Sequence, residues 1–185
     1  MLTKENKIFL INLVKEIIRC ELTGEKFSVK CPDDAIFRKN VGAFVTLKKQ
    51  GQLRGCIGYV IGYKTLFETI LDMSKAAAFN DPRFNSVKEN EISELEVEIS
   101  ILSELINVEN INEIEIGRDG LIISKGYYQG LLLPQVAVEW GWNREQFLSE
   151  TCRKAGMHGD CWKEKDVIIK RFTAEVFSEK ELSDS

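Results

Sequence analysis

The chain has 185 residues, of which 44% are hydrophobic and 29% charged, and its formal net charge is −4. A chain of this length buries roughly 70% of the surface that its unfolded form exposes, so it needs neither a disulfide nor a metal ion to fold. The acidic balance argues against nucleic-acid binding, which usually requires a basic stripe. The runs Lys48-Lys49 with Arg54 and Arg153-Lys154 are too short to change this and are typical of solvated charge.

Membrane and secretory classes are also excluded. No apolar run reaches the roughly 20 residues that a membrane span requires, and charges throughout residues 1–22 argue against a signal peptide or an anchor. The five cysteines are odd in number and never spaced C-x-x-C. This pattern argues against a disulfide framework or a zinc ribbon and predicts reduced thiols in the cytoplasm.

Hydrophobic spacing predicts the elements of the first half. Residues 4–22 have one apolar helical face, with Thr3 as N-cap and Gly24 as the stop, and residues 25–40 form a surface loop. GAFVTLKKQGQLRGCIGYV predicts a β-hairpin, and residues 64–80 predict a helix that ends before the proline of NDPRF. ELEVEISIL alternates apolar and polar side chains, which predicts a strand with one buried and one wet face.

The second half repeats this order. DGLIISKGYYQGLLLPQVAVEWGW predicts a second pair of apolar runs joined by a turn, and NREQFLSETCRKAG predicts a helix over about residues 143–156. DVIIKRFTAEVF predicts a last strand, and SEKELSDS a frayed polar tail. Since each half reads strand, glycine turn, strand, helix, we infer a weak internal duplication that gives residues 53–58 and 130–135 related positions.

The main candidate site is the stretch LRGCIG. Residues i and i+2 of a strand point to the same face, so Arg54 and Cys56 are expected to project together. A guanidinium beside a thiol favours the reactive thiolate. Gly55 and Gly58 leave room for a second backbone or for a ligand. The alternative stays open that Cys56 is a small buried side chain, because a cysteine nucleophile usually needs a base and the only histidine, His158, lies far downstream.

Four further polar residues are candidates for ligand binding. Asp81 and Arg83 follow a helix in NDPRF and are expected to form a structural ion pair or to hold an anion. Gln135 is expected at a helix N-terminus, where free N–H groups attract anions. Glu139 lies in an otherwise apolar helix, so it is expected to pair with an arginine or to face a cleft.

Neither a metal site nor a cofactor is predicted. The glutamates of ELEVEISIL are more typical of a solvated strand face than of a metal-binding row. The sequence contains no G-x-G-x-x-G, P-loop, H-E-x-x-H or G-x-S-x-G motif.

Six segments in order resemble the AMMECR domain family, whose prokaryotic members are also called AmmeMemoRadiSam system protein A. They are FVTLKKQGQLRGCIG, AAAFNDPRF, ELEVEISIL, GRDGLIIS, GLLLPQVAVEWGW and FLSETCRKAG. The resemblance runs from about residue 8 to 177. It implies an α/β fold of two interleaved strand-hairpin-helix repeats around a curved, barrel-like mixed sheet. We expect one domain over residues 1–185, with a larger part of 1–40 and 85–185 and a smaller part of 41–84.

The resemblance also implies that LRGCIG is the functional site, and that the protein is associated at the gene level with a Memo-like protein and a radical S-adenosylmethionine (SAM) enzyme. It names no reaction. The chain departs from the family pattern at Asn85-Ser86, which replaces a proline-rich continuation, and at Tyr59, where a small hydroxyl residue is common. Both changes affect the shape of a pocket rather than a candidate side chain.

The leading hypothesis is therefore a cytoplasmic enzyme, or enzyme component, of a modification pathway that acts on a small-molecule or protein substrate. Its catalytic residues would be Cys56 and Arg54, and its substrate-binding residues Gly55, Gly58, Asp81, Arg83, Gln135 and Glu139. The alternative is a non-catalytic binding or adaptor protein. A nucleic-acid-associated role is weaker because the chain is acidic.

Overall fold

The computed structural model describes residues 2–183, which form two compact units. Unit 1 comprises Met1–Leu102 with Glu175–Ser185, and unit 2 comprises Ser103–Ala174. The predicted smaller part, residues 41–84, lies wholly within unit 1, so the division of the chain differs from the expected boundaries. Within residues 2–183, no helix is both long enough and apolar enough to cross a membrane.

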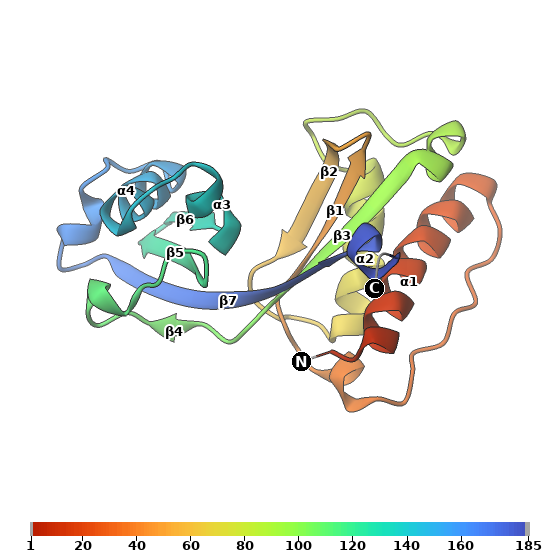
Figure 1. The fold of residues 1–185 in the computed structure, drawn as a ribbon, viewed down its shortest axis with the longest axis horizontal. Helices are drawn as coiled ribbons and strands as arrows, with labels where there is room; N and C mark the ends of the chain where they lie inside the picture. Colours follow the sequence, from red (N-terminus) through yellow and green to blue (C-terminus); the bar gives the residue numbers. More distant parts are fainter. Residues whose placement is uncertain (1, 184–185) are drawn as a thin grey trace. The chain divides into compact units, whose positions relative to one another are not determined.

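Unit 1 packs helices on an antiparallel sheet (Figure 1). Its strands are β1 (Ala43–Lys49), β2 (Gln52–Tyr59) and β3 (Leu95–Leu102), and its helices are α1 (Lys4–Thr23), α2 (Leu66–Phe79) and α5 (Glu179–Ser183). Strand β1 lies between β2 and β3 and pairs antiparallel with both. The predicted caps of α1 are confirmed: Thr3 accepts the Asn6 N–H, and Gly24 ends the helix at φ +72°.

One hydrophobic core holds the whole of unit 1 together. Alternate residues of β1 and β3 point into it, and α1 and α2 supply the opposing side chains. The hairpin and α2 share this core with α1, which explains why residues 41–84 do not separate as a part of their own. Its fully buried members include Leu10, Val14, Val45, Leu47, Leu66, Ile70 and Ile99.

Unit 2 repeats the combination of hairpin and helix (Figure 1). Its strands are β4 (Ile106–Asn107), β5 (Asp119–Lys125), β6 (Tyr128–Leu132) and the first part of β7 (Ile168–Ser178), which continues into unit 1. Strand β5 pairs antiparallel with β6 and with β7, and β4 pairs with β7. Helices α3 (Pro134–Glu139) and α4 (Arg144–Lys154) follow, and α4 begins at the predicted N-cap, Asn143.

The predicted α/β class is confirmed, with one hairpin and its following helix in each unit. The strand pairings described within the two units are antiparallel, whereas the sequence predicts a mixed sheet.

Each hairpin also carries a glycine where a helix crosses it. A β-carbon at Gly55 would lie 2.1 Å from the Ala77 carbonyl oxygen of α2, and one at Gly130 would lie 2.4 Å from the Ala155 nitrogen after α4. In the second strand of each hairpin, a glycine is therefore required because the helix packs too closely for a β-carbon.

The cysteines depart from the prediction of reduced thiols. Cys152 and Cys161 form a disulfide with an S–S distance of 2.05 Å, while Cys20, Cys31 and Cys56 are free. The chain after α4 folds back and brings the two Cα atoms within 5.9 Å, a distance that suits a disulfide. Local spacing could not show this reversal, because it depends on the packing of the segment that follows α4.

The C-terminal segment also differs from the expected frayed tail. Residues 179–183 form α5, and Leu182 packs against the core of unit 1. Residues 184–185 of that predicted tail lie outside the described residues.

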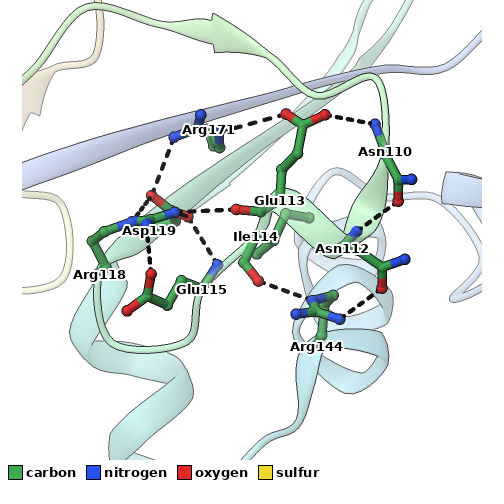
Figure 2. A network of polar contacts seen from close by, with 9 residues as sticks. All are labelled: Asn110, Asn112, Glu113, Ile114, Glu115, Arg118, Asp119, Arg144 and Arg171. Atoms are coloured by element: carbon green, nitrogen blue, oxygen red, sulfur yellow. Dashed lines mark hydrogen bonds and ion pairs between the residues drawn. The ribbon is translucent and has the colours of Figure 1, made fainter.

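A buried carboxylate organises the start of β5 (Figure 2). The side chain of Asp119 is fully buried and accepts hydrogen bonds from Arg118 Nη2 at 2.6 Å and the Glu115 backbone N–H at 2.9 Å, with Arg171 Nη1 at 3.7 Å. Burial alone raises the pKa of Asp119, but the bonds from Arg118 and Glu115 outweigh it and hold that pKa below its usual range. The network also includes Asn110, Asn112, Glu113, Ile114 and Arg144.

Candidate functional site

Cys56 lies on β2, an outer strand of the unit 1 sheet, and its side chain points away from the helices. The neighbouring Gly55 faces α2, and Ile57 packs against the core, so strand alternation places Cys56 on the opposite face. The thiol is half-buried, and Thr46 Oγ1, directly across on β1, donates a hydrogen bond to its sulfur at 3.2 Å. Cys56 is therefore a partly accessible thiol with a hydroxyl partner rather than a residue of the hydrophobic core.

Asp81 and Arg83 hold the backbone of Cys56 on the side of β2 that does not face β1. The Asp81 carboxylate accepts the Cys56 N–H at 2.9 Å, and Arg83 Nη2 donates to the Cys56 carbonyl oxygen at 3.1 Å. The predicted Asp81–Arg83 ion pair is present, at 2.7 Å. Hydrogen bonds from Arg83, aided by the Cys56 N–H, hold the pKa of Asp81 well below its usual range. The carboxylate is thus a permanent negative charge that fixes this part of the strand.

The loop that carries this pair is anchored by Val87 rather than by the aromatic residue of NDPRF. Phe84 is only half-buried, and the Arg83 guanidinium lies over its ring at 5.5 Å from the centroid. Val87 is the buried anchor, and its N–H donates to the Ala78 carbonyl at the end of α2.

Arg54 does not make the expected contact with Cys56 in the described chain. Its guanidinium donates to both oxygens of Glu91, at 3.0 and 2.9 Å, and to the backbone carbonyls of Asn85 and Ser86. The strand register explains the difference. Leu47 pairs with Gly55 and Lys48 with Leu53, so Arg54 is the extra residue of a β-bulge, which breaks the two-residue alternation of side chains.

Glu91 is the acceptor at the centre of this cluster, and the sequence reasoning did not find it. It lies in the 3₁₀ helix η2 (Glu89–Glu94) and binds Arg54, the Lys88 N–H and Lys49, whose Nζ is 3.5 Å away. Its side chain is 14% exposed. The hydrogen bonds from Arg54 lower the pKa of Glu91 to about 2.

The lowered pKa of Glu91 predicts a loss of stability in acid. The folded state holds this proton more weakly than the unfolded state, so the stabilisation is complete above about pH 4.5 and is lost as the pH falls through about 2. In Glu91→Gln we expect a lower unfolding free energy at neutral pH and a flatter profile between these values. Urea unfolding at several pH values measures both quantities. Glu96→Gln, at an exposed position of β3, is the control and should keep the wild-type slope; an unchanged slope in Glu91→Gln would contradict the assignment.

The space next to each of the two motif glycines is already filled by other atoms of the protein. The space in front of Gly55 holds the carbonyl of Ala77 at 2.1 Å from an ideal β-carbon. At Gly58 the ring of Phe44 would lie 2.3 Å from such an atom. The two glycines were expected to leave room either for a second backbone or for a ligand. The geometry supports close packing of other protein groups rather than a ligand.

A row of polar side chains crosses the sheet at Cys56. Thr46 pairs with Cys56 on one side and with Glu98 of β3 on the other, so the three side chains are cross-strand neighbours on one face. Lys48 Nζ contacts Glu98 at 2.8 Å. Glu98 is half-buried and Ser100 is buried, which corrects the expectation that this face of β3 is uniformly wet. Only the register of the hairpin against β3 could have revealed the row from sequence.

The remaining candidates belong to unit 2. Gln135 follows Pro134 at the start of α3, as predicted, and its Oε1 is buried without a hydrogen-bond partner among residues 2–183. Glu139 ends α3 and is exposed, so the expected arginine partner is missing from the described part of the chain. His158 lies beside Glu164, with 2.6 Å between Nε2 and Oε1.

Neither a metal site nor a basic surface emerges from these residues. Within the described range 2–183, no group of three or more His, Cys, Asp or Glu side chains could hold a metal ion. Four of the five basic residues considered for nucleic-acid binding contact carboxylates: Lys48 contacts Glu98, Lys49 contacts Glu91 and Glu94, Arg54 contacts Glu91, and Arg153 contacts Glu150.

Comparisons with known proteins place these features in a family context. A family model described as AMMECR1 matches residues 11–177. A protein of Methanothermobacter thermautotrophicus is 41% identical over 186 residues, covering 96% of this chain and 96% of its own, and one of Thermococcus kodakarensis is 43% identical, covering 93% and 89%. The crystal structure of an uncharacterized protein from Pyrococcus horikoshii matches with a TM-score of 0.84 at 41% identity, over 93% of this chain and 90% of that one. The matched range includes LRGCIG, NDPRF and the whole of unit 2.

Proposed function

Because this chain belongs to the AMMECR1 family, we propose that it is a thiol-dependent component of a modification pathway, with LRGCIG as its functional site. The observation that carries the proposal is the setting of Cys56. Its half-buried thiol projects from the sheet face opposite the helices, accepts a hydrogen bond from Thr46, and stands on a backbone held by Asp81 and Arg83. Such a fixed geometry suits a reactive group, because a positioned nucleophile loses little entropy on reaction.

The residues around Cys56 have separate roles in this proposal. Cys56 is the nucleophile, and the Thr46 hydroxyl, which donates a hydrogen bond to the sulfur, orients it. Arg83 takes the role expected of Arg54: it contacts Cys56, is 54% exposed, and its Nη1 has no recorded partner within residues 2–183, so it can bind an anionic group of a substrate. Arg54 and Glu91 are positioning residues for the start of the motif.

The pathway partners follow from the family resemblance alone. We propose that the protein acts in the cytoplasm with a Memo-like protein and a radical SAM enzyme, on a small-molecule or protein substrate. For Gln135 and Glu139 a supporting polar role stays a prediction, because neither contributes to the unit 1 cluster that carries the proposal.

Alkylation of the native protein tests the reactivity of the thiol. We expect iodoacetamide to modify Cys56 faster than Cys31, a free and half-buried cysteine of the same unit, and faster than cysteine in solution.

Loss of one hydrogen bond to the sulfur in Thr46→Val should slow the alkylation of Cys56 by roughly fivefold. Thr69→Val is the matched control, because the Thr69 hydroxyl is buried in α2 without a hydrogen-bond partner among residues 2–183. Mass spectrometry of each cysteine gives the rates. If Cys56 reacts no faster than Cys31 and free cysteine, the nucleophile role is wrong.

The packing of the two glycines favours a second candidate function, a non-catalytic adaptor. Both Gly55 and Gly58 are required by neighbouring protein groups, so LRGCIG also fits the role of a tightly packed structural strand. Cys56→Ser separates the two functions. Full pathway activity with an unchanged unfolding midpoint would support the adaptor, whereas lost activity in a folded variant would support the thiol.

A further inference from the structure

Unit 2 contains a cavity that no part of the proposed function uses. It lies between the turn that joins β5 to β6 and the segment that follows α4, and its volume is about 640 Å³. Small-molecule sites typically span roughly 300–1,000 Å³ and combine apolar walls with a few convergent polar groups. Both conditions are met here, because tyrosine, methionine and glycine residues line the cavity together with Lys125, His158, Glu164 and Asp166.

The cavity has one wall that is fixed by the packing of unit 2 and another that carries exposed side chains. Tyr127 and Tyr128 come from the β5–β6 turn, and Met157 comes from the chain after α4. The disulfide between Cys152 and Cys161 ties that chain to the buried face of α4, and Cys161 itself lines the cavity. The wall around Cys161 is therefore formed before a ligand arrives, which lowers the entropic cost of binding there, whereas the exposed rings of Tyr127 and Tyr128 are ordered only when a ligand binds.

The charges at the cavity are unbalanced. Lys125 Nζ contacts Glu164 at 2.5 Å and Asp166 at 3.0 Å, so one ammonium faces two carboxylates. The other oxygen of Glu164 contacts His158 Nε2. Asp166 is 66% exposed, and Lys125 is the only partner recorded for its side chain among residues 2–183. With a neutral imidazole, the side chains of Lys125, His158, Glu164 and Asp166 together carry one net negative charge, and Asp166 is the carboxylate most available to a ligand.

We propose that this cavity binds a small organic ammonium ion, namely a primary amine carried on an apolar or aromatic body. The ammonium group pairs with Asp166, and the body lies against Met157 and the tyrosines. Tyr127 and Tyr128 bring two aromatic rings to the cavity lining, and the face of an aromatic ring attracts a cation rather than an anion. Glu164 and Asp166 would repel an anionic ligand, and Lys125 already pairs with both carboxylates. The charges that favour an amine therefore disfavour an anion.

Three probes of similar shape and different charge test the proposal on the full chain. Isothermal titration calorimetry near pH 7 compares 2-phenylethylamine, 2-phenylethanol and 3-phenylpropanoate. We expect the amine to bind several-fold more tightly than the alcohol and the carboxylate to bind least. In amide NMR spectra, the amine should shift the signals of residues 125–128 and 156–158. Equal affinities, preference for the carboxylate, no amine binding at millimolar concentration, or shifts confined to other residues would each overturn the proposal.

A matched pair of variants identifies the carboxylate. Asp166→Asn should weaken binding of the amine roughly threefold to fivefold, as expected for a part-exposed ion pair, and should leave the alcohol unaffected. Asp160→Asn is the control, because Asp160 is also an exposed aspartate paired with a lysine after α4 but does not line the cavity. Equal losses in the two variants would overturn the role of Asp166. Since the cavity and Cys56 belong to different units, thiol alkylation and amine binding are separate readouts.

Discussion

Replacing Gly55 by alanine is expected to destabilise unit 1 by about 3 kcal/mol or more, at the upper end of what overpacking costs in a well-packed core. The added β-carbon would lie 2.1 Å from the Ala77 carbonyl oxygen and 3.1 Å from its carbon. These are backbone atoms in α2, so no side-chain rotation relieves the contact. Either the helix or the strand must move, and both are built into the same core.

Hydrogen exchange of the α2 amides is the direct measurement, because all three tryptophans lie in unit 2 and do not report on this helix. Gly51→Ala in the β1–β2 turn is the control. A β-carbon there meets nothing within 4 Å, and the cost of its positive φ of +75° should be about 1 kcal/mol. A Gly55→Ala chain as stable as Gly51→Ala would show that the helix accommodates the methyl group.

Replacing Asp119 by asparagine should have a comparably large effect, in unit 2. The substitution keeps the volume of the side chain but removes the negative charge that Arg118 and Arg171 face. Breaking a buried ion pair by removing one partner costs about 3–5 kcal/mol, because the other charge loses its compensation. Since Arg118 is partly exposed and can turn toward water, we expect a value near the lower limit.

Tryptophan fluorescence during urea unfolding follows this effect, because Trp140, Trp142 and Trp162 all report on unit 2. The matched control is Asp33→Asn. Asp33 pairs with Arg38 on the surface, where such a pair is worth at most about 1 kcal/mol. If both substitutions lowered the unfolding free energy by the same small amount, the buried network would not stabilise unit 2.

Local sequence signals predicted the elements whose ends are set by nearby residues. Helix α1 begins at Thr3 and α4 at Asn143, because each cap accepts an N–H three residues later. The alternation of ELEVEISIL likewise identified the core-facing residues of β3. These predictions depend only on contacts within a few positions of the chain, which is why they were accurate.

The candidate site was predicted less completely, because its contacts join distant segments. The pairing of Thr46 with Cys56 depends on hairpin register, and the bulge at Arg54 is visible only from that register. The engagement of Arg54 by Glu91 requires a 3₁₀ helix that lies 37 residues away. NDPRF was recognised as a polar loop, but only the folded chain brings Arg83, rather than Arg54, to Cys56.

The hydrogen bonds that Asp81 and Arg83 make to the Cys56 backbone have a consequence for how partners can approach. An outer strand normally offers a row of free N–H and C=O groups to which another polypeptide can add as an extra strand. At Cys56 both groups are already occupied, and the bulge at Arg54 interrupts the row next to it. This edge is thereby protected from β-augmentation and from edge-to-edge aggregation. A protein that recognises LRGCIG must therefore contact its side chains from the face of the sheet opposite the helices, where the half-buried thiol of Cys56 lies.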